Sequence, residues 1–275
     1  MDLNRVCDII ELPAPVKRAV IASGHLPEVK QAEQYKALLY DRATWGDGVR
    51  AVATTLGEDP NGMKMLAFML LRAAETHARY VAMAVDDTIF ADTMKFCTRF
   101  VLDHQEHYGT YAFTWGWWFP RQLSFQEFRI GTLEYELIET DKGRSISIHI
   151  PGDATLSLDA LRQSYLAARA TIARIAPDFA AADMFCDSWM LSPVLHDLLP
   201  ARSNILAFQE SFDLIEIDPA NRHATRWIFG RDDLPLTDLS EGTSLQRNTK
   251  ALLLKGGNIG SAVGKLRADP WRSSP

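Results

Sequence analysis

The sequence predicts an α+β protein, in which an all-helical N-terminal domain precedes a mixed β-sheet domain with flanking helices. In the first part of the chain apolar residues recur at three- and four-residue spacing, the period of an amphipathic helix. From Phe128 they alternate with polar residues, the period of a strand. Residues 145–190 then read as strand, helix and strand, an order that favours a parallel strand pair. The change of period predicts domains at residues 1–118 and 119–275.

Composition excludes several kinds of partner. A chain of 275 residues is long enough for two domains, and 47% apolar with 23% charged residues is ordinary for a globular protein. The net charge is −6, and each predicted domain carries three more acidic than basic residues. Binding to nucleic acid or to an anionic membrane requires concentrated positive charge, so we expect neither.

The chain shows no signal for export. Residues 1–11 are acidic and lack the apolar segment of a signal peptide, and no run approaches the roughly 18 apolar residues of a membrane span. Cys7, Cys97 and Cys186 are far apart and have no metal-ligand spacing, so we expect buried, reduced thiols. Together these features indicate a cytoplasmic protein.

Helix starts are recognisable in the first domain. Pro13 favours a helix start, and a long helix is predicted over residues 63–85. Asp86 and Asp87 predict the N-cap of a following helix, whose apolar stripe runs over residues 90–108.

His104 and His107 share one face of that following helix, which raises a metal site as an alternative. The spacing is not H-E-x-x-H, no third ligand is evident, and His104 falls on the apolar stripe. We therefore expect a packing or surface pair and no metal.

An aromatic cluster follows, from Trp115 to Phe119. Two interpretations stay open. The cluster either forms the floor of a ligand pocket, with Trp117 and Trp118 touching the substrate, or joins the two domains by burying large aromatic areas.

The next stretch predicts two strands, over residues 128–138 and 145–150, joined by a turn at 141–143. Successive strand residues point to opposite faces, so Glu134 and Glu136 share a face opposite to their apolar neighbours. A register that keeps the apolar faces together places Glu136 and His149 on one face and close to each other. A three-residue turn alone would favour the other register, in which these two residues point to opposite faces.

The later elements follow from caps and periodicity. Ser157 is an N-cap candidate for a helix that buries Leu158 and ends before Pro177. We expect the tail from Asp269 to fray. The elements between are a strand at 184–190, a short helix at 203–209, strands at 214–217 and 225–229, a helix capped by Thr243 or Ser244, and a strand at 259–266.

Some stretches are specific enough to be compared with known families. They are Trp115-Gly-Trp-Trp118, the segment from Phe128 to Glu136, His149-Ile-Pro151, the segment from Ser188 to Pro193, Ser203-Asn-Ile205 and the segment from Thr243 to Arg247. In this order they resemble a bacterial acyltransferase family with an N-acyltransferase N-terminal domain and a GNAT-like C-terminal domain. The resemblance covers nearly the whole chain, and its C-terminal motifs are the more specific.

The resemblance implies that acyl-coenzyme A is a co-substrate, bound where two central parallel strands, here 145–150 and 184–190, separate. The loop 151–156 and the helix start at Ser157 would hold the pyrophosphate, because helix N-termini bind anions. Gly152 and Ser157 are therefore candidate cofactor-binding residues. The loop lacks the usual Q/R-x-x-G-x-G/A pattern, since Gly152 is its only glycine and Asp153 adds negative charge.

Other candidates come with structural alternatives. Arg247, one turn into the last helix, either holds an anion or is a surface or domain-locking arginine. Asp187 and Trp189 are candidates for substrate contact, although Asp187 on an inner strand would be costly without a partner such as Arg129. Ser188 does not lie in the G-x-S-x-G motif of hydrolases, so we do not expect it to be a nucleophile.

Transfer of an acyl group to an amine needs a base and donors for the oxyanion. Glu136, His149 and Glu134 are the candidate bases. The alternative for the glutamates is a solvated sheet face, and for His149 a hydrogen bond that fixes the turn at Pro151.

Two functional hypotheses follow. The first is a transferase that moves an acyl group from acyl-coenzyme A to an amine on a small-molecule substrate, without a covalent enzyme intermediate. The second is a non-catalytic module that binds a small molecule or a protein on a degenerate GNAT-like fold. The shared-face carboxylates and histidine favour the first, and the missing phosphate loop favours the second.

Overall fold

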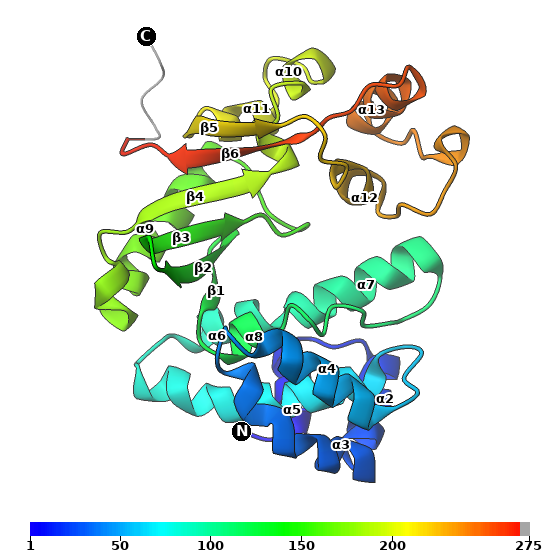
Figure 1. Cartoon of the computed structure of the whole chain (residues 1–275), viewed down its shortest axis with the longest axis vertical. Coiled ribbons are helices and arrows are strands. Elements are labelled where there is room, and N and C mark those ends of the chain that lie inside the picture. Colours follow the sequence, from blue (N-terminus) through cyan, green and yellow to red (C-terminus); the bar gives the residue numbers. More distant parts are fainter. Residues whose placement is uncertain (270–275) are drawn as a thin grey trace. The chain divides into compact units, whose positions relative to one another are not determined.

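The computed structural model describes residues 1–269 and forms two compact units that divide after Ile130 (Figure 1). The domain boundary predicted from the change of period, after Trp118, stays a prediction. No helix in residues 1–269 is both long enough and apolar enough to cross a membrane. Beyond Asp269, the tail that we expected to fray lies outside the described residues.

The first unit is helical, as predicted. Its elements are α1 (Leu3–Ile9), α2 (Ala14–Gly24), α3 (Pro27–Gln31), the 3-10 helix η1 (Ala32–Leu39), α4 (Trp45–Leu56), α5 (Met63–Ala82), α6 (Asp87–Met94), α7 (Phe96–Tyr108), α8 (Pro120–Leu123) and strand β1 (Glu127–Ile130). Helix α5 is central, because it packs against α1, α2, α3, α4, α6 and α8. Residues 66–70 of α5 are all buried, as expected of a helix surrounded by other helices.

The predicted helix starts are confirmed, and one predicted helix is divided. Pro13 precedes α2, and the Asp86 carboxylate caps α6 by accepting from the Thr88 amide at 2.8 Å. The single helix expected over residues 90–108 is wrong, because α6 and α7 meet at Lys95. The Thr93 hydroxyl donates to the carbonyl of Ile89, and such a bond within a helix often bends it.

The second unit combines strands and helices. Its elements are β2 (Leu133–Thr140), β3 (Gly143–His149), α9 (Leu158–Ile175), η2 (Pro177–Phe179), β4 (Asp183–Ser188), η3 (Trp189–Leu191), α10 (Leu195–Leu198), α11 (Asn204–Gln209), β5 (Phe212–Asp218), α12 (Ala224–Phe229), η4 (Leu236–Asp238), α13 (Ser244–Leu254) and β6 (Ser261–Leu266). Within this unit the strand order is β2-β3-β4-β6-β5. Among the strand pairs described, β3 and β4 pair in parallel, whereas β2 with β3, β4 with β6 and β5 with β6 are antiparallel. The sheet is therefore mixed, as predicted.

One predicted strand is interrupted by a turn. The strand expected over residues 128–138 is wrong, because Gly131 and Thr132 turn the chain from β1 into β2. Gly131 has φ +66°, a conformation that glycine adopts without steric cost. A Cβ at Gly131 would also lie only 3.1 Å from Ser164 of α9, so the turn is close to that helix.

Helix α9 crosses over from β3 to β4, and its apolar stripe is buried. Ser157 caps it as predicted, by accepting from the Ala160 amide. The expected burial of Leu158 is wrong, since this side chain is 55% exposed at the first position of the helix. The buried positions of α9 are Leu161, Ser164, Tyr165, Ala168, Ile172 and Ile175.

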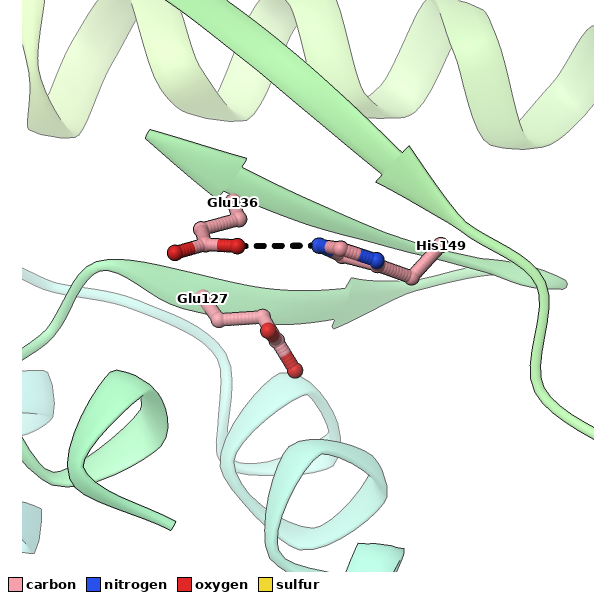
Figure 2. Close-up of side chains that lie close together, drawn as sticks. All are labelled: Glu127, Glu136 and His149. Atoms are coloured by element: carbon pink, nitrogen blue, oxygen red, sulfur yellow. Dashed lines mark hydrogen bonds and ion pairs between the residues drawn. The ribbon is translucent and has the colours of Figure 1, made fainter. Parts of the chain in front are cut away.

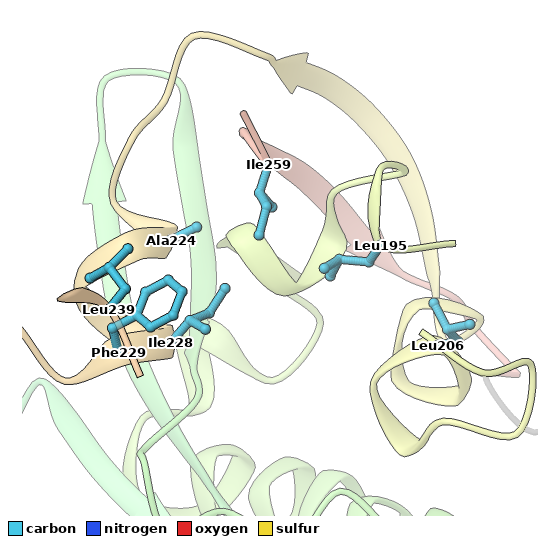
Figure 3. Close-up of a cluster of buried hydrophobic side chains, with 7 residues drawn as sticks. All are labelled: Leu195, Leu206, Ala224, Ile228, Phe229, Leu239 and Ile259. Atoms are coloured by element: carbon cyan, nitrogen blue, oxygen red, sulfur yellow. The ribbon is translucent and has the colours of Figure 1, made fainter. Parts of the chain in front are cut away.

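The region around β5 and β6 has an apolar cluster of its own (Figure 3). It consists of Leu195, Leu206, Ala224, Ile228, Phe229, Leu239 and Ile259. The strand predicted over residues 225–229 is wrong, because this segment is helix α12 and supplies three members of the cluster. The capped final helix and the last strand are confirmed as α13 and β6.

Candidate active site

A glutamate and a histidine meet on the polar face of the β2–β3 hairpin. The register pairs Glu134 with His149 and Glu136 with Ser147, so Glu136 and His149 are diagonal neighbours. His149 Nε2 lies 3.0 Å from Glu136 Oε2 (Figure 2). The predicted pairing of these residues is confirmed. Two residues connect the last paired positions, Thr140 and Gly143, and this turn length gives the register that places Glu136 and His149 on one face.

The burial of these groups differs from what alternation suggests. Glu136 and Glu134 are 3% and 7% exposed, so the solvated-face alternative for them is wrong. The His149 side chain is 26% exposed. A buried carboxylate is costly unless it is paired and hydrogen-bonded, and the imidazole supplies such a partner. The pair therefore joins a buried acid to a ring that reaches solvent.

The parallel strands separate beside this pair. The β3–β4 pairing runs from Ser145 with Asp183 to Ser147 with Phe185. Strand β3 nevertheless continues to His149, and β4 continues to Ser188. The two strands thus part at their carboxyl ends, where the resemblance places acyl-coenzyme A. An extended ligand with its own amides can add between parted strands.

The loop between β3 and α9 follows at the same end of the sheet. The Thr155 amide donates to Thr132 Oγ1 at 2.6 Å, and the Ala154 amide donates to the Pro151 carbonyl at 2.9 Å. A Cβ built at Gly152 meets nothing within 4 Å, so the space above Gly152 is open. Gly152 and Ser157 thus border the start of a long helix, whose first amides favour anions.

Asp187 lies on β4, which is an inner strand of the sheet as predicted, and its side chain is exposed there. Its pKa is nevertheless raised, mainly because part of the carboxyl is desolvated, and further because Asp218 and Glu216 are negative. His223 and His149 partly offset this effect on the pKa. The proposed pairing with Arg129 stays a prediction.

Two further candidates occupy structural positions in the second unit. Trp189 is partly buried against the apolar cluster of Figure 3. Arg247 donates through Nη1 to the Glu241 carbonyl at 2.9 Å, a contact just ahead of its own helix. Ser188 caps η3, since its hydroxyl accepts from the Met190 amide. The substrate and cofactor roles assigned to Trp189 and Arg247 stay predictions.

The tryptophan candidates lie in the first unit. Trp117 is 52% exposed, stacks on Trp115 at 5.3 Å, and borders a pocket with Leu56, Met65 and Phe113. The indole N–H of Trp118 donates to Glu127 Oε1 at 3.2 Å. The substrate-floor and domain-joining interpretations both stay predictions.

Glu127 is a residue that the sequence analysis missed. It is 1% exposed on β1, and Gln122 Nε2 donates to its Oε1 at 2.6 Å. Its sequence signal was weak, because it is an acidic residue at the first position of a short strand.

The expected histidine pair also has local partners. His104 Nδ1 lies 2.6 Å from the Thr110 carbonyl, and His107 Nδ1 lies 3.2 Å from Asp103 Oδ1.

Imidazole and carboxylate are the ligand types of many metal sites, and Glu136 and His149 offer one of each. The expectation of no metal stays a prediction.

Comparisons with known proteins agree with this architecture. The sequence profile of the N-acyltransferase N-terminal domain matches residues 1–125, and that of the GNAT-like C-terminal domain matches residues 127–266. A search of curated protein sequences finds no match. The predicted resemblance and the α+β fold are confirmed.

Solved structures share the fold. A crystal structure of an acyltransferase in complex with decanoyl-CoA and teicoplanin has a TM-score of 0.82 and 20% identity, covering 95% of this chain and 86% of that chain. A mutant acyltransferase in complex with octanoyl-CoA has a TM-score of 0.81 and 19% identity, covering 96% of this chain and 86% of that chain.

Proposed function

Because the chain belongs to the family of the GNAT-like C-terminal domain, we propose that it is an N-acyltransferase that moves an acyl group from acyl-coenzyme A to an amine. The Glu136–His149 pair beside the parted strands carries this proposal. The similar acyltransferases, crystallised with decanoyl-CoA, octanoyl-CoA and teicoplanin, support a medium-chain acyl donor and an amine on a glycopeptide as the substrates.

The residues present fit the donor in part. The parted ends of β3 and β4 suit an extended pantetheine arm, and the start of α9 at Ser157 suits a pyrophosphate. The open space above Gly152 would let a ligand approach the backbone there. The Asp153 carboxylate fits least well, because it adds negative charge to a loop that would hold an anion.

His149 is the proposed base. Glu136, as a carboxylate, only accepts hydrogen bonds, so the proton of a neutral His149 lies on Nε2 and the lone pair lies on Nδ1. In Figure 2 that second nitrogen lies on the side of the ring away from Glu136. His149 Nδ1 would take the proton from the acceptor amine as its nitrogen attacks the thioester carbon. The carbon–sulfur bond then breaks, and coenzyme A leaves as the thiolate.

Glu136 would orient the ring and stabilise the imidazolium that forms. This division of roles follows the logic of catalytic dyads in which a carboxylate fixes the tautomer of a histidine. A buried carboxylate suits the task, since its attraction for a nearby positive charge is weakly screened.

A variant series tests the proposal. We expect the wild type to release coenzyme A from decanoyl-CoA in the presence of an amine glycopeptide and to form the N-acyl product, detected by mass spectrometry. His149→Ala should lower kcat by about 10²- to 10⁴-fold, the usual contribution of a positioned base. His196→Ala, an exposed histidine of the same unit, is the matched control and should leave kcat unchanged.

The second hypothesis, a non-catalytic binding module, is favoured by Asp153 and by the absence of the usual glycine-rich loop. Calorimetry with acyl-coenzyme A separates the two hypotheses. No heat at millimolar ligand, together with no product from any amine tried, would replace the transferase with the binding module.

A further inference from the structure

Thr132 fastens the loop between β3 and α9 to the turn that precedes β2. Its hydroxyl accepts from the Thr155 amide at 2.6 Å and donates to the Thr155 carbonyl at 3.0 Å. Thr132 is 8% exposed, so water competes little for these bonds. One side chain thus satisfies both backbone groups of a loop residue 23 positions away.

The turn that carries Thr132 is itself fixed to α9. An ideal Cβ at Gly131 lies 3.1 Å from Ser164 Cα, and the Leu133 amide donates to Ser164 Oγ at 3.3 Å. Ser164 is fully buried in the middle of the helix. The loop is therefore connected to α9 in two ways. It runs directly into the N-terminus of the helix, and it is hydrogen-bonded to the turn that packs against the middle of the helix.

We propose that Thr132 is a positioning residue for coenzyme A: it sets where the amides of the loop 151–157 lie relative to the first turn of α9. This inference rests on the proposed function, because that function assigns the loop to the pyrophosphate. Amides bind an anion well only when they converge on it, and a small displacement of one group weakens the whole set.

Thr132→Val tests the inference, since valine has the shape of threonine without the hydroxyl. The variant leaves the Thr155 amide and carbonyl without this partner, and we expect CoA to bind about tenfold more weakly in calorimetry. Pantetheine, which lacks the phosphates, should bind the variant as well as it binds the wild type. Thr132→Ser, which restores the hydroxyl, should restore CoA affinity.

Ser192→Ala is the matched control. The Ser192 hydroxyl also joins distant backbone, donating to the Ile259 carbonyl at 2.5 Å and accepting from the Val194 amide at 3.3 Å, but it does not touch the loop. We expect a lower Tm from both variants and weaker CoA binding only from Thr132→Val.

Equal CoA affinity in Thr132→Val and wild type would overturn the inference and leave the proposed function standing. Equal weakening of CoA and pantetheine would also overturn it, because Thr132 would then act on general stability. A wild type that binds no CoA would instead contradict the proposed function itself.

Discussion

His149 and Glu136 differ in exposure, and this difference assigns their proposed roles. Glu136 is almost fully buried, whereas about a quarter of the His149 side chain is exposed. A base must receive a proton from the substrate and return it to water, so the group nearer solvent suits that task. The buried carboxylate suits the orienting role, because its surroundings hold it in place.

Glu136→Gln separates orientation from charge. Glutamine keeps the size of the side chain but does not stabilise the imidazolium, so we expect kcat/KM to fall by roughly 10- to 1,000-fold. Steady-state kinetics of the variant and the wild type measure the change.

Glu134→Gln is the comparison variant for this prediction. Glu134 is also buried and is directly opposite His149 in the register. We expect it to cost less activity, because the hydrogen bond of His149 Nε2 is to Glu136. A larger loss from Glu134→Gln than from Glu136→Gln would contradict the assignment.

Asp187 gives a stability prediction with a definite sign. Desolvation and the charges of Asp218 and Glu216 raise its pKa in the folded protein. A raised pKa means that the folded state binds this proton more tightly than the unfolded state, so stability falls as pH rises through the folded value. Asp187→Asn should therefore raise the Tm at pH 8 and leave it unchanged at pH 3. The gain in the free energy of unfolding should be less than about 1 kcal/mol, because the group is exposed.

Asp183→Asn on the same strand is the control for Asp187. Its carboxylate pairs with Lys265 at 2.7 Å, so its removal should give no such gain at pH 8. Thermal unfolding at the two pH values measures both variants. A lower Tm for Asp187→Asn at pH 8 would show that Asp187 has a stabilising partner.

At the scale of elements, helix α13 depends on a reciprocal cap. Thr243 Oγ1 accepts from the Gln246 amide at 3.1 Å, and Gln246 Oε1 accepts from the Thr243 amide at 3.1 Å. Gln246 Nε2 also donates to the Ile228 carbonyl at 3.1 Å, which ties α13 to α12. The cap therefore stabilises the packing of two helices in addition to one helix end.

Thr243→Ala should lower the free energy of unfolding by about 1 kcal/mol, the usual cost of losing a threonine cap. Urea unfolding measures the change. Thr237→Ala is the control, because the Thr237 hydroxyl bonds to the adjacent Asp238 and caps no helix. An effect of equal size in both variants would argue against the cap as the cause.

Helix α12 illustrates what local sequence does not determine. Trp227, Ile228 and Phe229 favour strands, which is why the sequence predicts a strand over residues 225–229. In the structure Ala224, Ile228 and Phe229 are buried, at a spacing that places them on one side of a helix. Packing against residues distant in sequence, such as Leu195 and Ile259, overrides the local preference.

At the scale of the whole molecule, the same limit applies to the candidate site. The closeness of Glu136 and His149 was predictable, because it follows from the register that keeps the apolar faces of the two strands together. The burial of Glu136 was not, because alternation shows which residues share a face and not whether that face is covered. The parting of β3 and β4 was predictable from the family resemblance alone, since no residue pattern marks where a parallel pair ends.

The groups assigned to coenzyme A all belong to the unit that begins at Gly131, and this gives a prediction for the whole chain. A ligand stabilises the state that binds it, by about 2.7 kcal/mol at one hundred times Kd. Hydrogen exchange with saturating CoA should therefore slow in residues 145–161 and 183–188, and change little in residues 1–126. His149→Ala should show the same slowing of exchange, because a base is not needed for binding. Slowing confined to residues 1–126 would instead place the donor site in the helical unit and contradict the proposed site.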